Sequence, residues 1–443
     1  MLNISTLNAR VFAPSDAEGK VRLSKQPFRR TLNNSLSCLL TVAGLTFLGG
    51  VANAQTFTLN TLINFDSING ANSQAGLVMD SLGNFYGTTA GGGANGDGTV
   101  FKLSSSGTLA TLVNFNNTNG AEPQSNLVMD SQGNLYGTTT LGGTNSVGTV
   151  FKVSSSGTLT TLVNFNNTNG SYPQAGLVMD SQGNIYGTTY NGGTNGYGTV
   201  FKVSSSGVLT TLVNFNYTNG SAPQSNLIID SQGNLYGTTV QGGAYYDGTV
   251  FKVSSSGVLT TLVSFNYANG AYPQAGLVMD SQGNLYGTAG GGGTNSDGTV
   301  FKLSSSGTLT TLVTFNGANG KSPDAGLVMD SQGNLFGTTA SGGVNSDGTV
   351  FKLSSSGTLT TLVNFDGTNG KSPDASLIMD SQGDLFGTTS AAGANNDGTI
   401  FELALPSVTH DLPVTPEPGT LALFATGSIT ALGFLARKRH CRK

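Results

Sequence analysis

The sequence predicts an all-β fold: a seven-bladed β-propeller whose four-stranded antiparallel blades form a closed ring. Three observations predict it. The chain repeats every fifty residues, each repeat holds four short β-favouring runs, and one extra run near the start matches a run missing at the end. The run LVMDSLGNFYGTT begins at Leu77, and close copies follow every fifty residues up to Leu377 without an insertion. These seven copies assign residues 55–406 to one repeated domain.

The four β-favouring runs are clearest in the second repeat. They are Ser125–Asp130, Asn134–Thr139, Gly148–Ser154 and Thr158–Phe165, named strands a, b, c and d below. Short turns containing glycine join a to b and c to d, so each repeat is expected to form an antiparallel meander. A period near fifty is similar to that of kelch-type propeller blades.

Ring closure is predicted from the two ends of the repeat region. No strand d follows Gly398–Leu405, which is strand c of the last repeat, but a d-like run, Thr56–Phe65, precedes the first strand a. Pairing these two segments completes the seventh blade from both ends of the chain and leaves no unpaired joint. A linear β-solenoid is the alternative, although it would need distinctive end caps that the sequence does not show.

Residues 1–54 are predicted to be a signal peptide with an extended n-region. Basic residues, including Arg29 and Arg30, precede an apolar run that ends in Ala52-Asn53-Ala54. A small residue on either side of one variable residue is typical of a cleavage site, which places cleavage between Ala54 and Gln55. A later translation start and a twin-arginine signal are the alternatives for this segment.

The C-terminal end is predicted to be a second sorting signal. Residues 407–418 form a linker that ends in Pro416, Glu417 and Pro418, and residues 419–443 hold an apolar stretch followed by a basic tail. This stretch is long enough for a short membrane span with its positive flank left inside. The order of the three parts resembles the PEP-CTERM sorting signal. A plain C-terminal inner-membrane anchor is the alternative.

The PEP-CTERM resemblance implies a partner and a location. The partner is an exosortase, a membrane transpeptidase-like enzyme of bacteria that make exopolysaccharide. The chain would be exported by a Gram-negative-type bacterium and transiently anchored in the inner membrane through its C-terminal segment.

The repeats themselves also resemble a known family. GTVFKLSSSGTLTTLVNF, which begins at Gly348, and LVMDSQGNLYGTT, which begins at Leu127, are similar to the GloVer tandem repeats of secreted bacterial proteins. The resemblance covers residues 56–405. It supports the fold and implies no activity.

Composition excludes several classes of chemistry. Between Gln55 and Pro406 there are 19 acidic and 8 basic side chains, a net charge of −11, so nucleic acid is not an expected partner. All cysteines and histidines of the chain lie outside the repeats: Cys38, Cys441, His410 and His440. The repeats therefore lack the residues of disulfide scaffolds, structural zinc sites and histidine-activated nucleophiles. No cofactor and no metal site are expected.

The links between strands suggest a binding surface. In propellers the a–b and c–d turns share one face, and the d–a and b–c links share the other. Here the turns hardly differ between repeats, whereas the links do. Eight tyrosines lie in these links: Tyr172, Tyr190, Tyr197, Tyr217, Tyr245, Tyr246, Tyr267 and Tyr272. Neighbouring blades should gather them into an aromatic patch suited to polysaccharide; sequence drift on a tolerant surface is the alternative.

Repeated charged residues have simpler expected roles. An aspartate recurs in every a–b turn, where capping of backbone N–H groups is a better account than a ring that attracts a cation. These are Asp80, Asp130, Asp180, Asp230, Asp280, Asp330 and Asp380. Turn formation is also the expected role of the aspartates before strand c: Asp97, Asp247, Asp297, Asp347 and Asp397. Lys102 and its equivalents through Lys352 are expected to snorkel along the strands.

An enzyme of the glycoside hydrolase or polysaccharide lyase type would need carboxylates that break the repeat. The candidates are Glu122, Asp324, Asp374, Asp66 and Asp366. Asp324 and Asp374 lie in near-identical NGKSPD links beside Lys321 and Lys371, which favours a duplicated surface feature over an acid and a base of different pKa. The sequence therefore predicts a non-catalytic binding or structural module at the cell surface or in the extracellular matrix. A purely structural matrix protein without a specific ligand is the other alternative.

Overall fold

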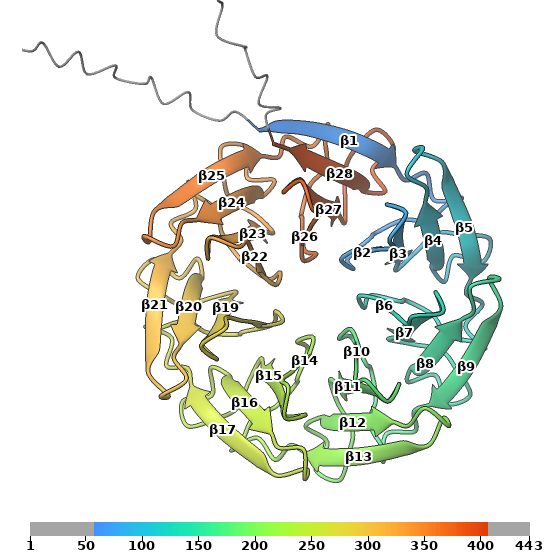
Figure 1. The fold of residues 1–443 in the computed structure, drawn as a ribbon, viewed down its shortest axis with the longest axis horizontal. Coiled ribbons are helices and arrows are strands. Elements are labelled where there is room, and N and C mark those ends of the chain that lie inside the picture. The colour runs from blue at the N-terminus through green and yellow to red at the C-terminus, as the bar shows by residue number, and fades with distance from the viewer. Residues whose placement is uncertain (1–56, 406–443) are drawn as a thin grey trace, which may run out of the picture. The chain divides into compact units, whose positions relative to one another are not determined.

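The computed structural model describes residues 57–405, which form seven four-stranded antiparallel sheets arranged in a ring (Figure 1). The predicted seven-bladed β-propeller is therefore confirmed. Within the described residues no helix is long and apolar enough to cross a membrane. The predicted signal peptide with its Ala54–Gln55 cleavage site, the motif Pro416-Glu417-Pro418 and the membrane segment all lie outside the described residues.

The strands follow the chain in blade order, with the innermost strand of each blade first. Blade 1 contains β2 (Val78–Met79), β3 (Phe85–Thr89), β4 (Thr99–Leu103) and β5 (Leu109–Asn114). Blade 2 contains β6 (Val128–Met129), β7 (Leu135–Thr139), β8 (Thr149–Val153) and β9 (Leu159–Asn164). Blade 3 contains β10 (Val178–Met179), β11 (Ile185–Thr189), β12 (Thr199–Val203) and β13 (Leu209–Asn214). Blade 4 contains β14 (Ile228–Ile229), β15 (Leu235–Thr239), β16 (Thr249–Val253) and β17 (Leu259–Ser264). Blade 5 contains β18 (Val278–Met279), β19 (Leu285–Ala289), β20 (Thr299–Leu303) and β21 (Leu309–Thr314). Blade 6 contains β22 (Val328–Met329), β23 (Leu335–Thr339), β24 (Thr349–Leu353) and β25 (Leu359–Asn364). Blade 7 contains β26 (Ile378–Met379), β27 (Leu385–Thr389), β28 (Thr399–Ala404) and β1 (Thr58–Asn64).

Strand a is shorter than predicted. The run Ser125–Asp130 was expected to be extended, but only Val128–Met129 pairs as β6. The blades converge at the axis. Backbone N–H groups just before strand a donate hydrogen bonds to a side chain of the next blade, and not to a neighbouring strand. The N–H of Gly76 donates to Asn126 Oδ1 at 2.7 Å, and that of Gly176 donates to Asn226 Oδ1 at 2.6 Å. At these junctions the crowded inner ends of neighbouring blades are thus held by side chains.

The hydrophobic core lies between the blades. Each junction buries the phenylalanine that ends strand d of one blade against the phenylalanine in strand c of the next. Phe115 and Phe151 lie in this way, with ring centroids 5.2 Å apart and both side chains fully buried. Threonine hydroxyls add polar links across the same junctions, as when Thr138 Oγ1 donates to the Ala175 carbonyl at 3.2 Å. Seven repeated junctions therefore replace one central core.

The ring closes as predicted, through β1. This strand pairs antiparallel with β28, and its register shifts between Thr61 and Ile63, where the other d strands shift as well. Phe65, just after β1, is fully buried and lies 5.4 Å from Phe101 of blade 1. Figure 1 shows β1 from the start of the described chain lying outside β28 from its end. The N-terminal strand therefore contributes the same contacts to the closing junction as every other strand d does to its own.

Candidate functional site

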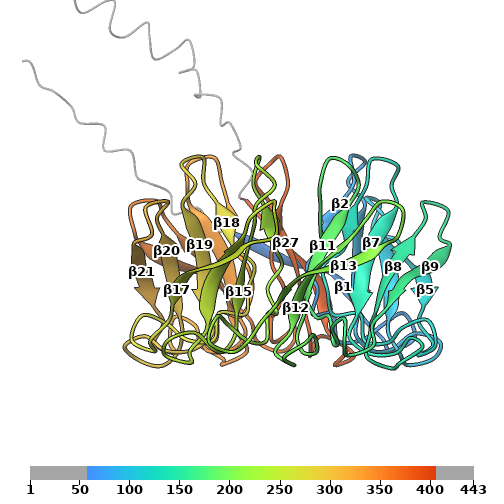
Figure 2. The same cartoon turned by 90° about the horizontal axis from the view of Figure 1, so that it is seen from below.

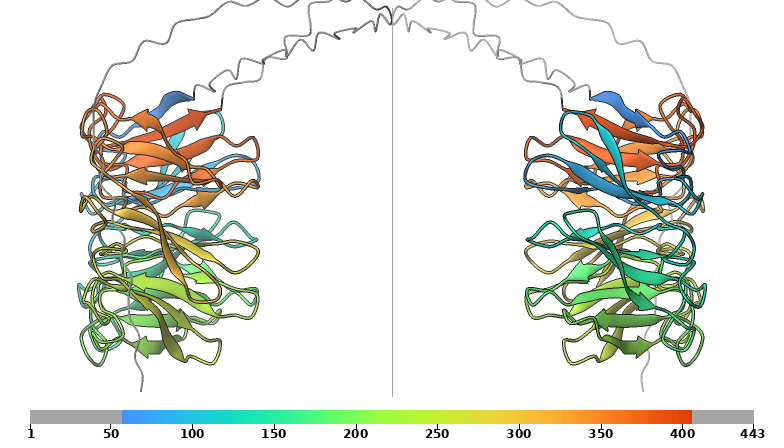
Figure 3. Two further views of the ribbon diagram at one scale, coloured as in Figure 1. Left: turned by 90° about the vertical axis from the view of Figure 1, so that its left-hand side faces the viewer. Right: turned by 90° about the vertical axis from the view of Figure 1, so that its right-hand side faces the viewer.

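The loops of the propeller form two opposite rims, visible at the ends of the strands in Figures 2 and 3. We name the rim of a–b and c–d turns the hairpin face, and the rim of d–a and b–c links the link face. Isolated bridges tie the two kinds of link together in all seven blades, such as the pair Ser221 and Gln241. The link face is therefore a backbone-paired surface rather than a set of independent loops.

Three of the eight predicted tyrosines form one cluster on the link face. The Tyr197 and Tyr217 ring centroids lie 5.3 Å apart, and those of Tyr217 and Tyr246 lie 5.8 Å apart with nearly parallel planes. Tyr197 follows β11, Tyr217 follows β13 and Tyr246 follows β15, so the cluster spans the junction of blades 3 and 4. Tyr197 is 39% exposed and Tyr246 is 64% exposed. We call these residues the tyrosine cluster.

Two members of the cluster occupy repeat positions that are left-handed in every blade, and Tyr172, Tyr267 and Tyr272 outside the cluster are left-handed as well. Tyr217 has a φ of 68° and Tyr246 a φ of 71°, in the left-handed region that bulky side chains rarely adopt. The positions equivalent to Tyr217 hold Gly, Asn or Ser in the other blades except blade 4, where Tyr267 stands. A left-handed tyrosine costs about 1 kcal/mol or more relative to glycine. Tyrosine at these two positions therefore lowers the folding stability relative to glycine.

The other five tyrosines do not join the cluster by ring contacts. Tyr245, Tyr267 and Tyr272 are exposed on the link face. Tyr172 packs against the core between blades 2 and 3, and Tyr190 is half-buried. The predicted patch is thus one three-ring cluster, with separate tyrosines at some of the nearby links. Sequence drift between the repeats is sufficient to explain Tyr172 and Tyr190.

A second feature, missed from the sequence, is a ring at the link-face end of the central channel. The d–a links end in a Gln or Asp that lies four residues after the glycine of the Asn-Gly pair, as Gln74 follows Gly70. These residues line a cavity of about 100 Å³. Its members are Gln74, Gln124, Gln174, Gln224, Gln274, Asp324 and Asp374. We call this set the channel ring. The signal that could have revealed it is the substitution of aspartate for glutamine at one repeat position in two consecutive blades.

The two aspartates of the channel ring titrate abnormally. Burial raises the pKa of Asp324 to about 6. Burial also raises the pKa of Asp374 to about 6; the nearby Asp324 charge adds to this rise, and a hydrogen bond donated by Ser390 at 2.8 Å opposes it. The structure thus differs from the predicted surface feature, because both residues line the channel mouth and their carboxyl groups are largely buried there.

The neighbouring lysines do not neutralise these carboxylates. Lys321 Nζ lies 3.3 Å from Asp297 Oδ1, and Lys371 Nζ lies 3.1 Å from Asp347 Oδ1. Asp297 and Asp347 were expected only to form turns, but they pair with the next blade. Asp397 also crosses a blade boundary, accepting a hydrogen bond from Ser67 Oγ at 2.6 Å. These aspartates therefore join neighbouring blades.

The remaining repeat-breaking acids are engaged locally. Asp66 Oδ1 accepts a hydrogen bond from the Asn69 N–H at 2.9 Å, and Asp366 Oδ1 accepts one from Thr368 Oγ1 at 2.7 Å. Both stabilise turns. Glu122 has only a long contact, 3.5 Å, with the Gln124 side chain. None of these acids forms a pair with either channel aspartate.

On the hairpin face the expected capping role of the repeated aspartates is confirmed. Asp130 Oδ1 accepts the N–H groups of Gln132 and Asn134, each at 2.9 Å. Its Oδ2 accepts the Asn134 side chain at 2.7 Å and the Tyr136 hydroxyl at 3.0 Å. Burial alone would raise the pKa of Asp130, but these hydrogen bonds together lower it below its usual value. The carboxylate is fully used by the turn.

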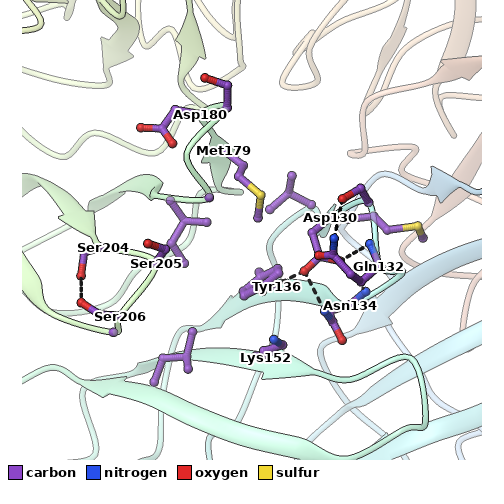
Figure 4. A pocket seen from close by; sticks show the side chains of 18 residues that line it. Asp130, Gln132, Asn134, Tyr136, Lys152, Met179, Asp180, Ser204, Ser205 and Ser206 are labelled. Carbon is purple, nitrogen blue, oxygen red and sulfur yellow. Dashed lines mark hydrogen bonds between the residues drawn. The ribbon is translucent and has the colours of Figure 1, made fainter.

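The strand lysines stack on aromatic rings of the neighbouring strand. Lys152 Nζ lies 5.3 Å from the Tyr136 ring centroid, and the same contact recurs in six blades. Figure 4 shows this lysine, tyrosine and aspartate lining a groove between blades 2 and 3, opposite Met179 and Asp180. The groove encloses about 830 Å³. On the blade 2 side, Lys152 stacks on Tyr136, and the Tyr136 hydroxyl donates a hydrogen bond to Asp130, so these three side chains contact one another in sequence.

The described residues limit what other chemistry the site can perform. Within residues 57–405 no three His, Cys, Asp or Glu side chains gather as they would around a metal ion. The channel cavity of about 100 Å³ is smaller than the roughly 300 Å³ at which small-molecule pockets begin. The cavity at the channel mouth is therefore below the usual size of a ligand pocket, whereas the tyrosine cluster lies on the open link face.

Solved structures of other proteins share the fold at low identity. The extracellular domain of a protein described as a hybrid two-component system, BT3049 of B. thetaiotaomicron, matches with a TM-score of 0.52 at 15% identity, over 81% of this chain and 42% of that one. The extracellular domain of a one-component system, BT4673 of the same organism, gives a TM-score of 0.51 at 12% identity, over 79% and 40%. This chain therefore spans less than half of either protein.

A third solved structure matches over most of its length. It is described as a 6-phosphogluconolactonase of Bacteroides uniformis, with a TM-score of 0.50 at 15% identity, over 73% of this chain and 94% of that one. At such identities these likenesses show the fold alone. A search of curated proteins returned no match.

Two family matches locate and classify the chain. Residues 414–439 match the PEP-CTERM protein-sorting motif, which implies export to the cell envelope or surface and processing by an exosortase from a membrane-anchored precursor. Residues 49–238, 159–330 and 225–415 match the Gloeobacter/Verrucomicrobia repeat, so the matches together cover the whole propeller. The chain belongs to the Gloeobacter/Verrucomicrobia repeat family.

Proposed function

We propose that this exported protein is a non-catalytic module that binds polysaccharide through the tyrosine cluster on its link face. The observation that carries the proposal is the cluster itself: Tyr197, Tyr217 and Tyr246 lie side by side, and two of them are held in a strained backbone conformation. Exposed aromatic rings among polar groups suit the apolar faces and hydroxyls of sugars. Backbone strain in bulky residues concentrates at ligand sites.

The surroundings of the cluster support a sugar ligand over an apolar one. Asn214, Asn216 and Asn219 lie in or beside the same links; their side-chain oxygens accept hydrogen bonds within the turns, and their side-chain NH₂ groups donate none within residues 57–405, so these donors are left for sugar hydroxyls. The rings lie on an open surface, which can receive a chain at any point along its length. We therefore favour a polymer, the exopolysaccharide of a Gram-negative-type producing cell, and a location at the cell surface or in the extracellular matrix.

The proposal assigns no catalysis. A glycosidase divides two carboxylates into an acid and a base by giving them different environments. Burial raises the pKa of Asp324 and of Asp374 to the same value, about 6, so the two carboxylates are not divided into an acid and a base. They also line a cavity below the usual size of a ligand pocket. A glycoside hydrolase or lyase activity would appear as new reducing ends or unsaturated sugars on incubation with exopolysaccharide.

Binding of the full chain to polysaccharide arrays tests the proposal. The test variant is Tyr197→Val/Tyr217→Asn/Tyr246→Ser, in which each new residue already stands at the same repeat position in another blade. The fold should therefore persist. Removing three aromatic contacts should weaken binding by at least about tenfold.

The matched control is Val208→Thr, which changes a 61% exposed residue on the hairpin face to the threonine of other repeats. It should bind like the parent chain. Tyr245→Ala, next to the cluster, measures how far the surface extends. Unaltered binding by the triple variant, or no binding by the parent to any polysaccharide, would remove the tyrosine cluster from consideration.

A further inference from the structure

A second pair of exposed tyrosines lies on the link face at the junction of blades 4 and 5, next to the junction that holds the tyrosine cluster. Tyr267 and Tyr272 lie in the d–a link between these blades and are 44% and 41% exposed. The b–c link of blade 5, which begins with four glycines at 290–293, pairs with this segment. The Gly290 N–H donates to the Tyr272 carbonyl at 3.2 Å, and the Gly293 N–H donates to the Tyr267 carbonyl at 2.7 Å. Both tyrosines are thus fixed along one glycine segment.

The glycines leave the Tyr272 ring open to solvent. A Cβ atom at Gly291 would come within 3.1 Å of the ring atom Cδ2, so the ring lies directly beside the Gly291 backbone. No other blade has glycine at the positions of both Gly290 and Gly291. Tyr172 occupies the same repeat position as Tyr272, but blade 3 carries Asn191 beside it, and Tyr172 is less exposed and packs against the core. The bare backbone therefore supports one side of the Tyr272 ring without covering the other.

Asp247 adds a carboxylate to the same junction. Its backbone carbonyl accepts the Tyr272 N–H at 2.9 Å. At the closing junction the equivalent residue is Asp397, whose carboxylate accepts a hydrogen bond from Ser67 Oγ, and Tyr267 stands at the repeat position of Ser67. The repeat therefore brings the Asp247 carboxylate beside Tyr267. Burial raises the pKa of Asp247, and no hydrogen bond or nearby cation within residues 57–405 opposes the rise.

The charge of this part of the link face disfavours an anionic ligand. The links at the junctions of blades 3 and 4 and of blades 4 and 5 contain no lysine or arginine. The link-face lysines Lys321 and Lys371 lie in later links, and both are paired with aspartates. An ionised carboxylate without a counter-charge repels uronic acids and sulfate groups, whereas it accepts hydrogen bonds from sugar hydroxyls.

From this arrangement we propose that Tyr267, Tyr272 and Asp247 form a second sugar subsite, so that the link face binds a neutral polysaccharide chain running from the tyrosine cluster across blade 4. The inference rests on the proposed function and extends it. The open side of the Tyr272 ring stacks on the apolar face of one sugar, and Asp247 accepts a hydrogen bond from a hydroxyl group. A polymer that occupies both subsites binds more tightly than one that occupies either, because its second contact is intramolecular.

Arrays that carry neutral glucans, mannans and galactans beside alginate and polygalacturonate test this inference with the full chain. The parent should prefer neutral polymers, and its affinity for their oligosaccharides should rise with length until both subsites are filled. The test variant is Asp247→Val/Tyr272→Ser, whose new residues stand at the same repeat positions in other blades, so the fold should persist. It should bind long chains at least about tenfold more weakly and lose the gain with length.

Two single variants sharpen the result. Gly291→Asn introduces the residue of blade 3 against the Tyr272 ring and should weaken long-chain binding, although it removes no aromatic ring and no charge. Tyr172→Ser is the matched control, because it makes the same substitution at the same repeat position of another junction. It should bind like the parent.

The outcomes separate this inference from the proposed function. The second subsite is overturned if Asp247→Val/Tyr272→Ser binds long chains like the parent while the triple tyrosine variant does not, or if Tyr172→Ser weakens binding equally. A preference of the parent for alginate or polygalacturonate overturns the neutral ligand. Absence of parent binding to every polymer overturns the proposed function and this inference together.

Discussion

At the residue scale, the link face holds side chains in states that folding alone does not favour. Tyr217 and Tyr246 are left-handed where glycine, asparagine or serine would be relaxed, and Asp324 and Asp374 are buried together without a counter-charge. Each departure costs free energy of folding. Departures of this kind concentrate where a protein binds something.

The two channel aspartates predict a specific pH dependence of stability in metal-free buffer. Their folded pKa is about 6, against about 3.8 in the unfolded chain. The folded state therefore binds more protons, so the stabilisation is complete below about pH 4 and is lost as the pH rises through about 6. The unfolding temperature of the parent in EDTA should fall across this window.

The variant Asp324→Gln/Asp374→Gln isolates this effect. Without the carboxylates the fall between pH 4 and pH 6 should largely vanish, and the variant should be more stable than the parent at pH 7.5 by on the order of 2 kcal/mol per carboxylate. Chemical denaturation at several pH values measures it. Parallel pH profiles for parent and variant would show that the carboxylates are not buried as described.

At the element scale, ring closure rests on β1 acting as an ordinary strand d. Phe65 is fully buried, like Phe215 at the junction of blades 3 and 4. Both contact the phenylalanine of strand c in the next blade, at 5.4 Å for Phe65 and 5.2 Å for Phe215. The two residues are thus equivalent although one lies near the start of the described chain.

Phe65→Ala and Phe215→Ala are accordingly expected to destabilise the propeller by similar amounts, about 3–5 kcal/mol each. Denaturant titration with tyrosine fluorescence and circular dichroism gives both values. Deleting Thr56–Phe65 should cost more still and lower cooperativity, because blade 7 keeps three strands. A Phe65→Ala variant as stable as the parent would mean that the ring is not closed by this strand.

Most of the fold was predictable because it follows from the fifty-residue period of the repeats and from the number of strands in each repeat. Four β-favouring runs in each repeat specified the blade, and the displaced strand Thr56–Phe65 specified its closure. The length of strand a was not predictable, because the inner ends of the blades are limited by crowding at the axis. Asn126 supports Gly76 there, fifty residues away. No local propensity encodes that contact.

The candidate site was predictable only in part. The links were correctly assigned to one face, but ring contacts join only Tyr197, Tyr217 and Tyr246. The direction of a side chain in an irregular link depends on backbone angles that sequence patterns do not specify. For the same reason Asp324, expected at the surface beside Lys321, instead lies at the channel mouth against Gly290 of blade 5.

At the scale of the whole molecule, the propeller offers one uniform rim and one varied rim. The hairpin face repeats the same aspartate, tyrosine and lysine contacts in blades 1–5. The link face carries the tyrosine cluster and the channel ring. The PEP-CTERM motif directs this chain to the cell envelope or surface, so its partners are expected among the molecules found there.

The most direct test of the account is retention of the exported protein by polysaccharide of the producing cell. Secreted parent chain and the variant Tyr197→Val/Tyr217→Asn/Tyr246→Ser are mixed with purified exopolysaccharide and separated by sedimentation, with Val208→Thr as control. The account predicts that the parent and the control sediment with the polysaccharide while most of the triple variant stays in solution. Equal retention of all three proteins would contradict it.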